Sequence, residues 1–147
     1  MSHVDTVILG IPETIYSLKR GERAASDFSD PLSDIADDVY RVIGINFSSQ
    51  GRRGGGSWAM VSEAWAKRKK SALILIESGA LMDSVTSGDP HITSHKLEME
   101  SDVEYAEIHQ FGGRGIPARP FIRFIDSDRQ RWHDILHEHL IEAMRGA

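Results

Sequence analysis

The residues that decide how the chain is organised are Tyr105-Ala106-Glu107-Ile108-His109-Gln110-Phe111-Gly112-Gly113-Arg114-Gly115-Ile116-Pro117-Ala118-Arg119-Pro120-Phe121. We call residues 105–121 the organising stretch. The stretch begins as an amphipathic run, breaks at two glycines and is stiffened again by Pro117 and Pro120. Each proline fixes its own φ and pushes the preceding residue toward an extended conformation, which predicts a loop with a defined exit direction. The stretch contains no nucleophile paired with a base and no metal ligands at a known spacing. These features favour a surface that meets another protein chain over a reaction site.

The residues after this stretch predict a short strand over 121–124 and a final helix over 127–145. Ser127 and Gln130 have the spacing of a capping box, with serine at the N-cap and glutamine three residues later. The apolar residues of the helix recur at helical spacing and predict one buried stripe. That stripe consists of Trp132, Ile135, Leu136, Leu140 and Met144.

A second long helix is predicted over 31–48, because apolar residues recur at three- and four-residue intervals from Leu32 to Ile43. Asp30 before Pro31 is typical of an N-cap followed by proline at the first helical position. A further helix is expected over 13–28, interrupted by Gly21. Strands are expected over 91–100, where polar and apolar residues alternate, and over 4–9, with a further segment within 72–87. The sequence thus predicts an α+β fold with a small, mainly antiparallel sheet, one face of which the two long helices cover.

The composition excludes several classes of protein. A length of 147 residues is typical of one compact domain, taken here as residues 1–147. The formal charge of −5 argues against a protein that coats DNA by neutralising phosphates. Because cysteine is absent, the chain has no disulfide, no thiolate zinc site and no cysteine nucleophile. No apolar run approaches the roughly 20 residues that span a bilayer, and no signal peptide is recognisable, so a soluble protein with no membrane partner is expected.

The glycine-rich loop Gly51-Arg52-Arg53-Gly54-Gly55-Gly56 lacks the Gly-Lys-[Ser/Thr] element of a phosphate-binding loop. A helix capped by Ser57 is expected to follow, from Trp58 to about Lys70. Its basic end complements the helix dipole, so a solvated helix end is one interpretation of the run. The other is a basic patch that faces DNA or an acidic partner. Its members would be Arg52, Arg53, Lys67, Arg68, Lys69 and Lys70.

One pattern resembles a metal site. His133 and His137 are four residues apart on the last helix, with Asp134 in the place where zinc hydrolases carry glutamate. Aspartate is one methylene too short to reach a metal-bound water, and His139 lies roughly 200° around the helix from His137. His91 and His95, on one strand, would be roughly 13 Å apart. We therefore expect no metal, no cofactor and no catalytic residues. A metal-dependent hydrolase using His133 and His137 remains the weaker alternative, beside a nucleic-acid-binding accessory protein.

Two residues of the organising stretch leave a choice open. His109 is expected either to donate to a backbone carbonyl near the Gly112 turn or to contact another subunit. Arg119 is expected either to pair with one of the chain's 22 acidic residues or to anchor an interface, where arginine and aromatic residues are enriched.

The chain resembles the phage virion morphogenesis family of tail completion proteins, as found in Mu-like phages. The resemblance rests on "YA-x-x-H-Q-x-G" at residues 105–112, "I-P-A-R-P-F" at 116–121, Trp58 before a basic helix, and Ile74–Val85, which is similar to the family's "IL-x-x-[ST]-G-x-L-x-x-S" signature. These blocks occur in family order between about residues 30 and 145.

The resemblance implies a structural virion protein without catalytic activity. Such a protein forms a homomeric ring, a hexamer by resemblance, at the head-proximal end of a phage tail, where it joins neighbouring neck or tail-tube proteins and lets DNA pass. It would be assembled in the cytoplasm of the host bacterium. Loops 50–57 and 111–118 are expected to become ordered when subunits dock. The residues expected at the subunit interface are Trp58, Tyr105, His109, Gln110, Phe111, Arg114, Pro117, Arg119 and Phe121.

Overall fold

The computed structural model describes residues 15–69 and 71–146. The predicted strand over 4–9 and Lys70 lie outside the described residues. Along the chain the helices are α1 (Ile15–Ser26), α2 (Ser29–Ser48), the 3₁₀ turn η2 (Arg52–Gly54), α3 (Glu63–Ala66), α4 (Ala80–Thr86), α5 (Ala106–Phe111) and α6 (Asp126–Arg145). The strands are β1 (His91–Ile92) and β2 (Leu97–Glu98).

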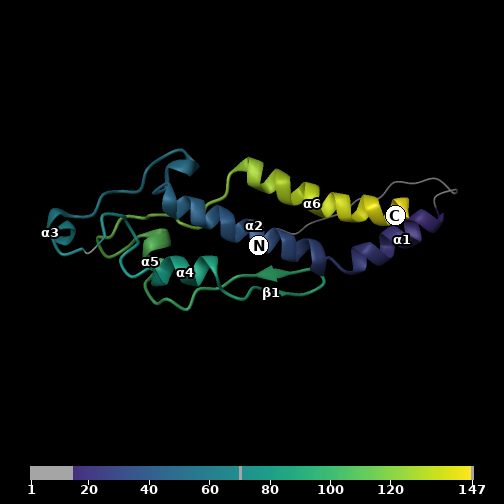
Figure 1. Ribbon diagram of the computed structural model, residues 1–147, viewed down its shortest axis with the longest axis horizontal. Helices are drawn as coiled ribbons and strands as arrows, with labels where there is room; N and C mark the ends of the chain where they lie inside the picture. The colour runs from purple at the N-terminus through teal and green to yellow at the C-terminus, as the bar shows by residue number, and fades with distance from the viewer. Residues whose placement is uncertain (1–14, 70, 147) are drawn as a thin grey trace.

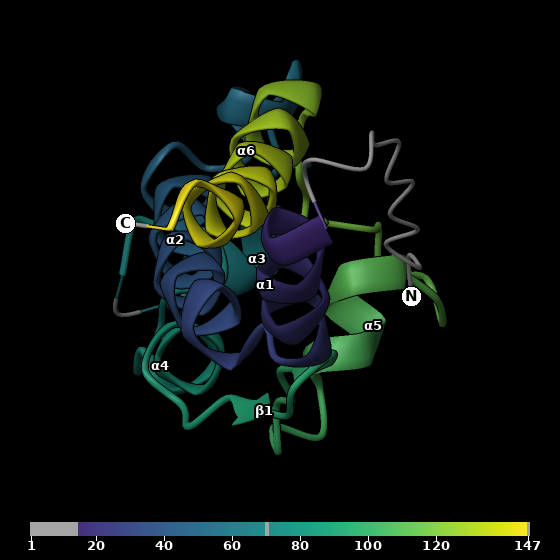
Figure 2. The same ribbon diagram turned by 90° about the vertical axis from the view of Figure 1, so that its right-hand side faces the viewer.

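Helix α2 is the axis of an elongated molecule (Figure 1). Helix α6 runs beside it on one side, and α4 and the β hairpin lie on the other side, as the end-on view also shows (Figure 2). Helix α1 packs against the C-terminal part of α6 at one end of the molecule. The short helices α3 and α5 lie at the opposite end, where the organising stretch is found.

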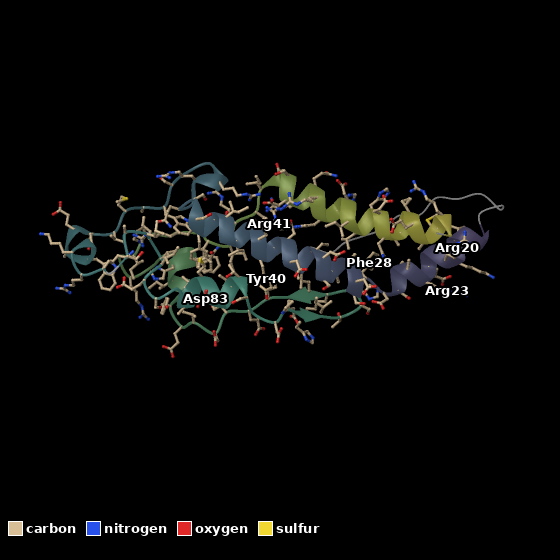
Figure 3. The ribbon with its side chains drawn as sticks, in the orientation of Figure 1. Arg20, Arg23, Phe28, Tyr40, Arg41 and Asp83 are labelled. Atoms are coloured by element: carbon tan, nitrogen blue, oxygen red, sulfur yellow. The ribbon has the colours of Figure 1, made fainter. Side chains whose placement is uncertain are left out.

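The long helix predicted over 31–48 is confirmed, but its start differs. The helix begins at Ser29, and its N-cap is Phe28, so neither Asp30 nor Pro31 occupies the predicted capping position. Instead the Ser29 backbone N–H donates to Asp27 Oδ1 at 2.9 Å, one turn earlier than the sequence indicated. Phe28 lies at the junction of α1 and α2 (Figure 3) and packs against His139, with ring centroids 5.4 Å apart.

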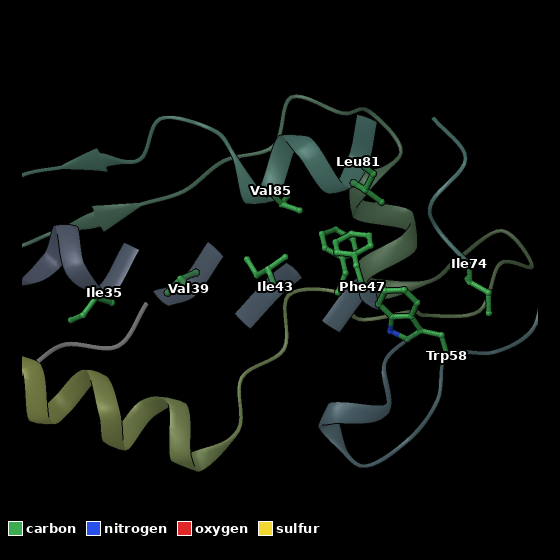
Figure 4. Packing of buried hydrophobic residues seen from close by; sticks show 9 residues of the cluster. Ile35, Val39, Ile43, Phe47, Trp58, Ile74, Leu81 and Val85 are labelled. Carbon is green, nitrogen blue, oxygen red and sulfur yellow. The ribbon is translucent and has the colours of Figure 1, made fainter. Parts of the chain in front are cut away.

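The apolar face of α2 carries the core (Figure 4). Ile35, Val39, Ile43 and Phe47 lie at successive turns of the helix and are all buried. Fully burying a side chain of this size contributes roughly 1.5–3 kcal/mol, so this face largely fixes the position of the helix. Its partners come from segments far apart in the sequence, and they are Trp58, Ile74, Leu81, Val85 and Phe121.

The final helix is also confirmed, with a different cap. It begins at Asp126, and the Asp128 carboxylate accepts a hydrogen bond from the Ile125 backbone N–H at 3.0 Å. Ser127 is therefore not the N-cap, and the Gln130 amide donates to Asp134 instead of reaching back to the helix start. The predicted apolar stripe faces inward: Leu140 is buried, and Trp132, Ile135 and Leu136 pack against the core as partly buried residues.

Helix α1 corresponds to the helix expected over 13–28. Gly21 does not interrupt this helix. The absence of a side chain at Gly21 lets Met144 of α6 approach, since a Cβ placed there would lie 3.0 Å from Met144 Cγ. The Arg20 guanidinium donates to the carbonyls of Ala143 and Met144 at the end of α6, at 3.0 and 2.7 Å. A cation at this position satisfies helix-terminal carbonyls and complements the dipole.

The α+β class is confirmed, but several predicted elements are wrong. The expected strand over 91–100 is a hairpin in which β1 pairs antiparallel with β2. Residues 121–124 form no strand, because side chains rather than a neighbouring strand bond their backbone. Residues 72–87 hold a loop and then α4. The helix expected over 58–70 shrinks to Glu63–Ala66, where Ser62 rather than Ser57 is the N-cap. Helix α2 packs against both strands, whereas α6 packs against α1 and α2.

Among the described residues, no helix has the length and apolar composition needed to cross a membrane.

Candidate assembly site

The glycine-rich part of the organising stretch is a tight hairpin. Gly113 and Ile116 exchange both backbone hydrogen bonds, each 2.9 Å long. Arg114 and Gly115 between them have φ of 51° and 79°, as a type I′ turn requires. Gly112 has φ 75°, and a Cβ there would lie 2.8 Å from the Ala118 backbone nitrogen. The hairpin therefore folds back onto the segment that leaves it, at Ala118, and only glycine permits this approach.

The exit segment is held by amide side chains. Gln110 Oε1 accepts from the backbone N–H groups of Phe121 and Ile122 at 3.1 and 3.0 Å, and its Nε2 donates to the Ile122 carbonyl at 2.9 Å. From α2, the buried Asn46 amide donates to the carbonyls of Phe121 and Arg123 at 2.8 and 2.9 Å. The segment after the prolines is thus held by bonds within the single chain. The expectation that residues 111–118 become ordered on docking stays a prediction.

The loop over 50–57 also has contacts within the chain at its two ends. Gly51 has φ 83° and lies directly under the Trp58 indole: a Cβ at Gly51 would be 2.4 Å from Trp58 Cδ1. The indole Nε1–H donates to the Pro120 carbonyl at 3.1 Å. Gln50 bonds to Ile74 through both its amide nitrogen and its amide oxygen. This loop therefore links the end of α2 to the organising stretch.

Arg119 is buried at 5% exposure; the predicted pair with an acidic residue is not formed within the described residues, and the interface alternative stays a prediction. Its Nε donates to the Ala59 carbonyl at 2.7 Å and its Nη2 to the Met60 carbonyl at 3.1 Å. Within residues 15–69 and 71–146, no carboxylate lies at ion-pairing distance from it. Burial lowers the pKa of the guanidinium. Arg119 is therefore a buried cation that fixes a neighbouring loop and lacks an anionic partner in the part of the chain described.

His109 lies next to Arg119, and its backbone carbonyl accepts the Arg119 N–H at 2.7 Å. Its Nδ1 is buried and has no hydrogen-bond partner among the described residues, so the predicted bond to a backbone carbonyl near Gly112 is wrong. Burial, and secondarily the charge of Arg119, lower the pKa of the imidazole. The neutral ring packs edge-on against Tyr105, with centroids 5.8 Å apart.

These residues line a groove of about 810 Å³. Its floor includes the buried Ile74 and Leu81, which Figure 4 shows beside the aromatic cluster of the core. Apolar side chains form the rim and remain largely exposed: Met60 (79%), Trp65 (52%), Tyr105 (46%) and Ile116 (36%). A groove of this size with an apolar rim and a few convergent polar groups is typical of a binding site.

Burial divides the residues expected at the interface. Trp58 and Phe121 are buried inside the chain, so they can offer little surface to a partner and instead support the segment, whereas Arg119 is buried but lines the groove. Gln110 is partly buried and bonded to residues 121 and 122. The remaining candidates lie at the surface or on the groove wall, and they are Tyr105, His109, Phe111, Arg114 and Pro117.

The predicted basic residues do not all present free charges. Arg53 is paired with the buried Asp128 across the start of α6 and is not available to a nucleic acid. Lys69 donates to the Leu73 carbonyl. Arg52, Lys67 and Arg68 are exposed, and Lys70 lies outside the described residues.

The two histidines of the metal-like pattern lie on the exposed face of α6. The rings of His133 and His137 are stacked with centroids 6.2 Å apart, and His133 lies 3.8 Å from Asp134. His139 instead bonds to the carbonyls of Ala24 and Asp27 at the α1–α2 junction. In the described ranges no three metal-ligating side chains come together.

Sequence reasoning missed the polar residues that hold the site. Asn46 is the clearest case, because it occupies a position of the apolar face of α2, one residue before Phe47. A lone amide side chain among buried apolar positions needs hydrogen-bond partners, so its place in the sequence pattern could have indicated a structural role for Asn46. The sequence analysis also did not predict a role for Asp38, whose carboxylate accepts hydrogen bonds from Arg131, Arg41 and the Trp132 indole.

The fold and the groove define a small α+β domain built on one long helix, with a binding surface at one end. The chain belongs to the phage virion morphogenesis family, whose model matches residues 13–141. The match confirms the resemblance seen in the motifs and gives the protein a structural or assembly role in a phage virion. Searches of curated proteins and of solved structures gave no match.

Proposed function

We propose that this protein is a tail completion or head–tail connector protein. It forms a homomeric ring, a hexamer by family resemblance, at the head-proximal end of the phage tail, contacts neighbouring neck or tail-tube proteins and lets DNA pass. Family membership gives the virion role. The observation that carries the finer proposal is the set of exposed apolar side chains around the groove at one end of the molecule.

These side chains are costly to leave in water. Met60 is 79% exposed and Trp65 is 52% exposed, and burying a large apolar side chain contributes roughly 1.5–3 kcal/mol. An isolated chain gains nothing from this exposure, whereas a chain that docks to another protein gains affinity from it. The arrangement supports assembly as the purpose of this end of the molecule.

The net charge of −5 suits a protein around a DNA conduit. An acidic protein repels phosphates on average, so DNA can pass without being held. The ion pair between Arg53 and Asp128 further reduces the cationic surface near the glycine-rich loop.

The proposal is tested in the phage itself. Deleting the gene, and supplying it in trans as the control, should give particles with tails that fail to join heads in the deletion and normal virions after complementation. Immunogold labelling should place the protein at the head-proximal end of the tail. Normal infectious virions without the protein would overturn the proposal.

A further inference from the structure

Helix α5 carries two different surfaces on opposite faces. Tyr105 at its N-cap and His109 one turn later line the groove. Glu107 and Phe111 are also one turn apart, but at about 100° per residue they lie roughly 200° around the helix from Tyr105 and His109. Both are exposed, and neither lines the groove. One helix therefore presents a concave surface on one side and a projecting phenylalanine with a carboxylate on the other.

Among the described residues no carboxylate forms an ion pair with Arg119, although Glu77 also lines the groove. Arg119 uses Nε and Nη2 on backbone carbonyls, while its Nη1 bonds to no acceptor among the described residues. A buried cation without an anion is costly, and a carboxylate that reached it would form a strong, charge-assisted hydrogen bond. Around it the rim is apolar, with Met60, Trp65 and Ile116 exposed. The complementary ligand is thus a large apolar side chain with a carboxylate about one helical turn away.

The opposite face of α5 has this chemistry. Phe111 is 74% exposed, and Glu107 precedes it by four residues, so both side chains project from the same face. We propose that copies of this chain pack head to tail, with Phe111 of one copy in the groove of the next and Glu107 on the Arg119 guanidinium. This proposal rests on the proposed ring and identifies the residues that join neighbouring subunits in it.

A second copy is the occupant favoured by the geometry. A contact between two different surfaces of the same chain is heterologous, and it closes into a ring when the rotation between neighbours divides a full turn. A two-fold contact would instead use the same surface twice and stop at a dimer. Placing the donor and acceptor surfaces on opposite faces of one helix allows every subunit to make both contacts at once.

The test uses two full-length variants that each remove one surface. Phe111→Ser removes the projecting side chain and leaves the groove intact. Ala80→Trp places a large side chain at an exposed position of the groove wall and leaves Phe111 intact. Both positions are exposed, so native folding is expected and is checked by circular dichroism and thermal unfolding. Sedimentation velocity measures assembly of the wild type, of each variant and of their equimolar mixture.

We expect the wild type to assemble and each variant to remain monomeric, with association weakened at least about tenfold. The mixture should form a heterodimer and no larger species, because only one complementary contact remains. Glu107→Arg should also weaken assembly, whereas Glu104→Arg, at an exposed acid outside the groove, is the matched control. A wild type that assembles while both variants assemble equally well, or a mixture that stays monomeric, overturns the inference and leaves the ring standing. A wild type that is monomeric overturns both.

Discussion

Arg53 in the glycine-rich loop and Asp128 in the first turn of α6 form an ion pair inside the molecule, with Nη1 2.8 Å from Oδ2. The Asp128 side chain is fully buried and also accepts from Arg131 and from the Ile125 backbone. Arg131 continues to Asp38 on α2. A chain of charges thus joins the loop, the axis helix and the last helix, and it positions the segment that follows the groove.

Replacing Asp128 by asparagine should be strongly destabilising. The substitution leaves Arg53 and Arg131 facing a neutral group; breaking a buried pair typically costs about 3–5 kcal/mol, which is an upper bound here because both arginines are partly exposed and Arg131 keeps Asp38. Urea unfolding followed by circular dichroism measures the loss. Asp126→Asn, two residues earlier and fully exposed, is the matched control and should change the free energy of unfolding by less than about 0.5 kcal/mol. Equal effects of the two substitutions would show that the buried pair does not stabilise the fold.

Stability should fall in acid. Hydrogen bonds from the arginines hold the pKa of Asp128 and of Asp38 below the usual range, despite the opposing effect of burial. A carboxyl whose pKa is lowered in the folded state contributes stability above its unfolded pKa, near 4, and loses it as the pH falls toward the folded pKa. The contribution of these two carboxylates to the free energy of unfolding should therefore be constant near neutral pH and decrease below about pH 4. In Asp128→Asn this decrease should be smaller. The same steepness in both proteins would contradict this assignment.

Gln110 should be needed for the exit segment. Gln110→Leu leaves the backbone N–H groups of Phe121 and Ile122 without their acceptor, which should cost about 1–3 kcal/mol. Gln110→Glu retains an acceptor oxygen and loses only the donor to the Ile122 carbonyl, so it should be the milder of the two. Hydrogen exchange at residues 121 and 122 should accelerate more in Gln110→Leu. Unchanged protection there would mean that the amide does not hold the segment.

Two glycines should respond oppositely to alanine. Gly112→Ala places a Cβ 2.8 Å from the Ala118 nitrogen at a φ of 75°, so it should be destabilising by more than about 1 kcal/mol. Gly44→Ala, inside α2 with no atom within 4 Å of the new Cβ, should be stabilising by about 0.5–1 kcal/mol. Thermal unfolding of both variants measures the contrast. A harmless Gly112→Ala would show that the hairpin does not require its glycine.

The two long helices could be predicted because their apolar periodicity extends over many turns and dominates local alternatives. Their first residues could not, since Asp27 and Asp128 compete with Asp30 and Ser127 for the same capping role. The prediction of one strand over residues 91–100 was wrong for a related reason. Alternation of polar and apolar residues there is equally compatible with one strand and with a hairpin.

At the site, the prolines and glycines indicated a defined loop, and Gly112 and the Arg114-Gly115 turn confirm it. The burial of Arg119 and Trp58 was not predictable, because it depends on contacts with residues some 60 positions away in the sequence. Arginine beside an aromatic residue in a rigid segment is as compatible with an anchor inside the chain as with one at an interface.

The most direct test of ring assembly is negative-stain imaging of the purified full-length protein, together with its mass measured by light scattering. We expect closed rings of uniform diameter and a mass of about six chains. A single chain at every concentration would contradict it.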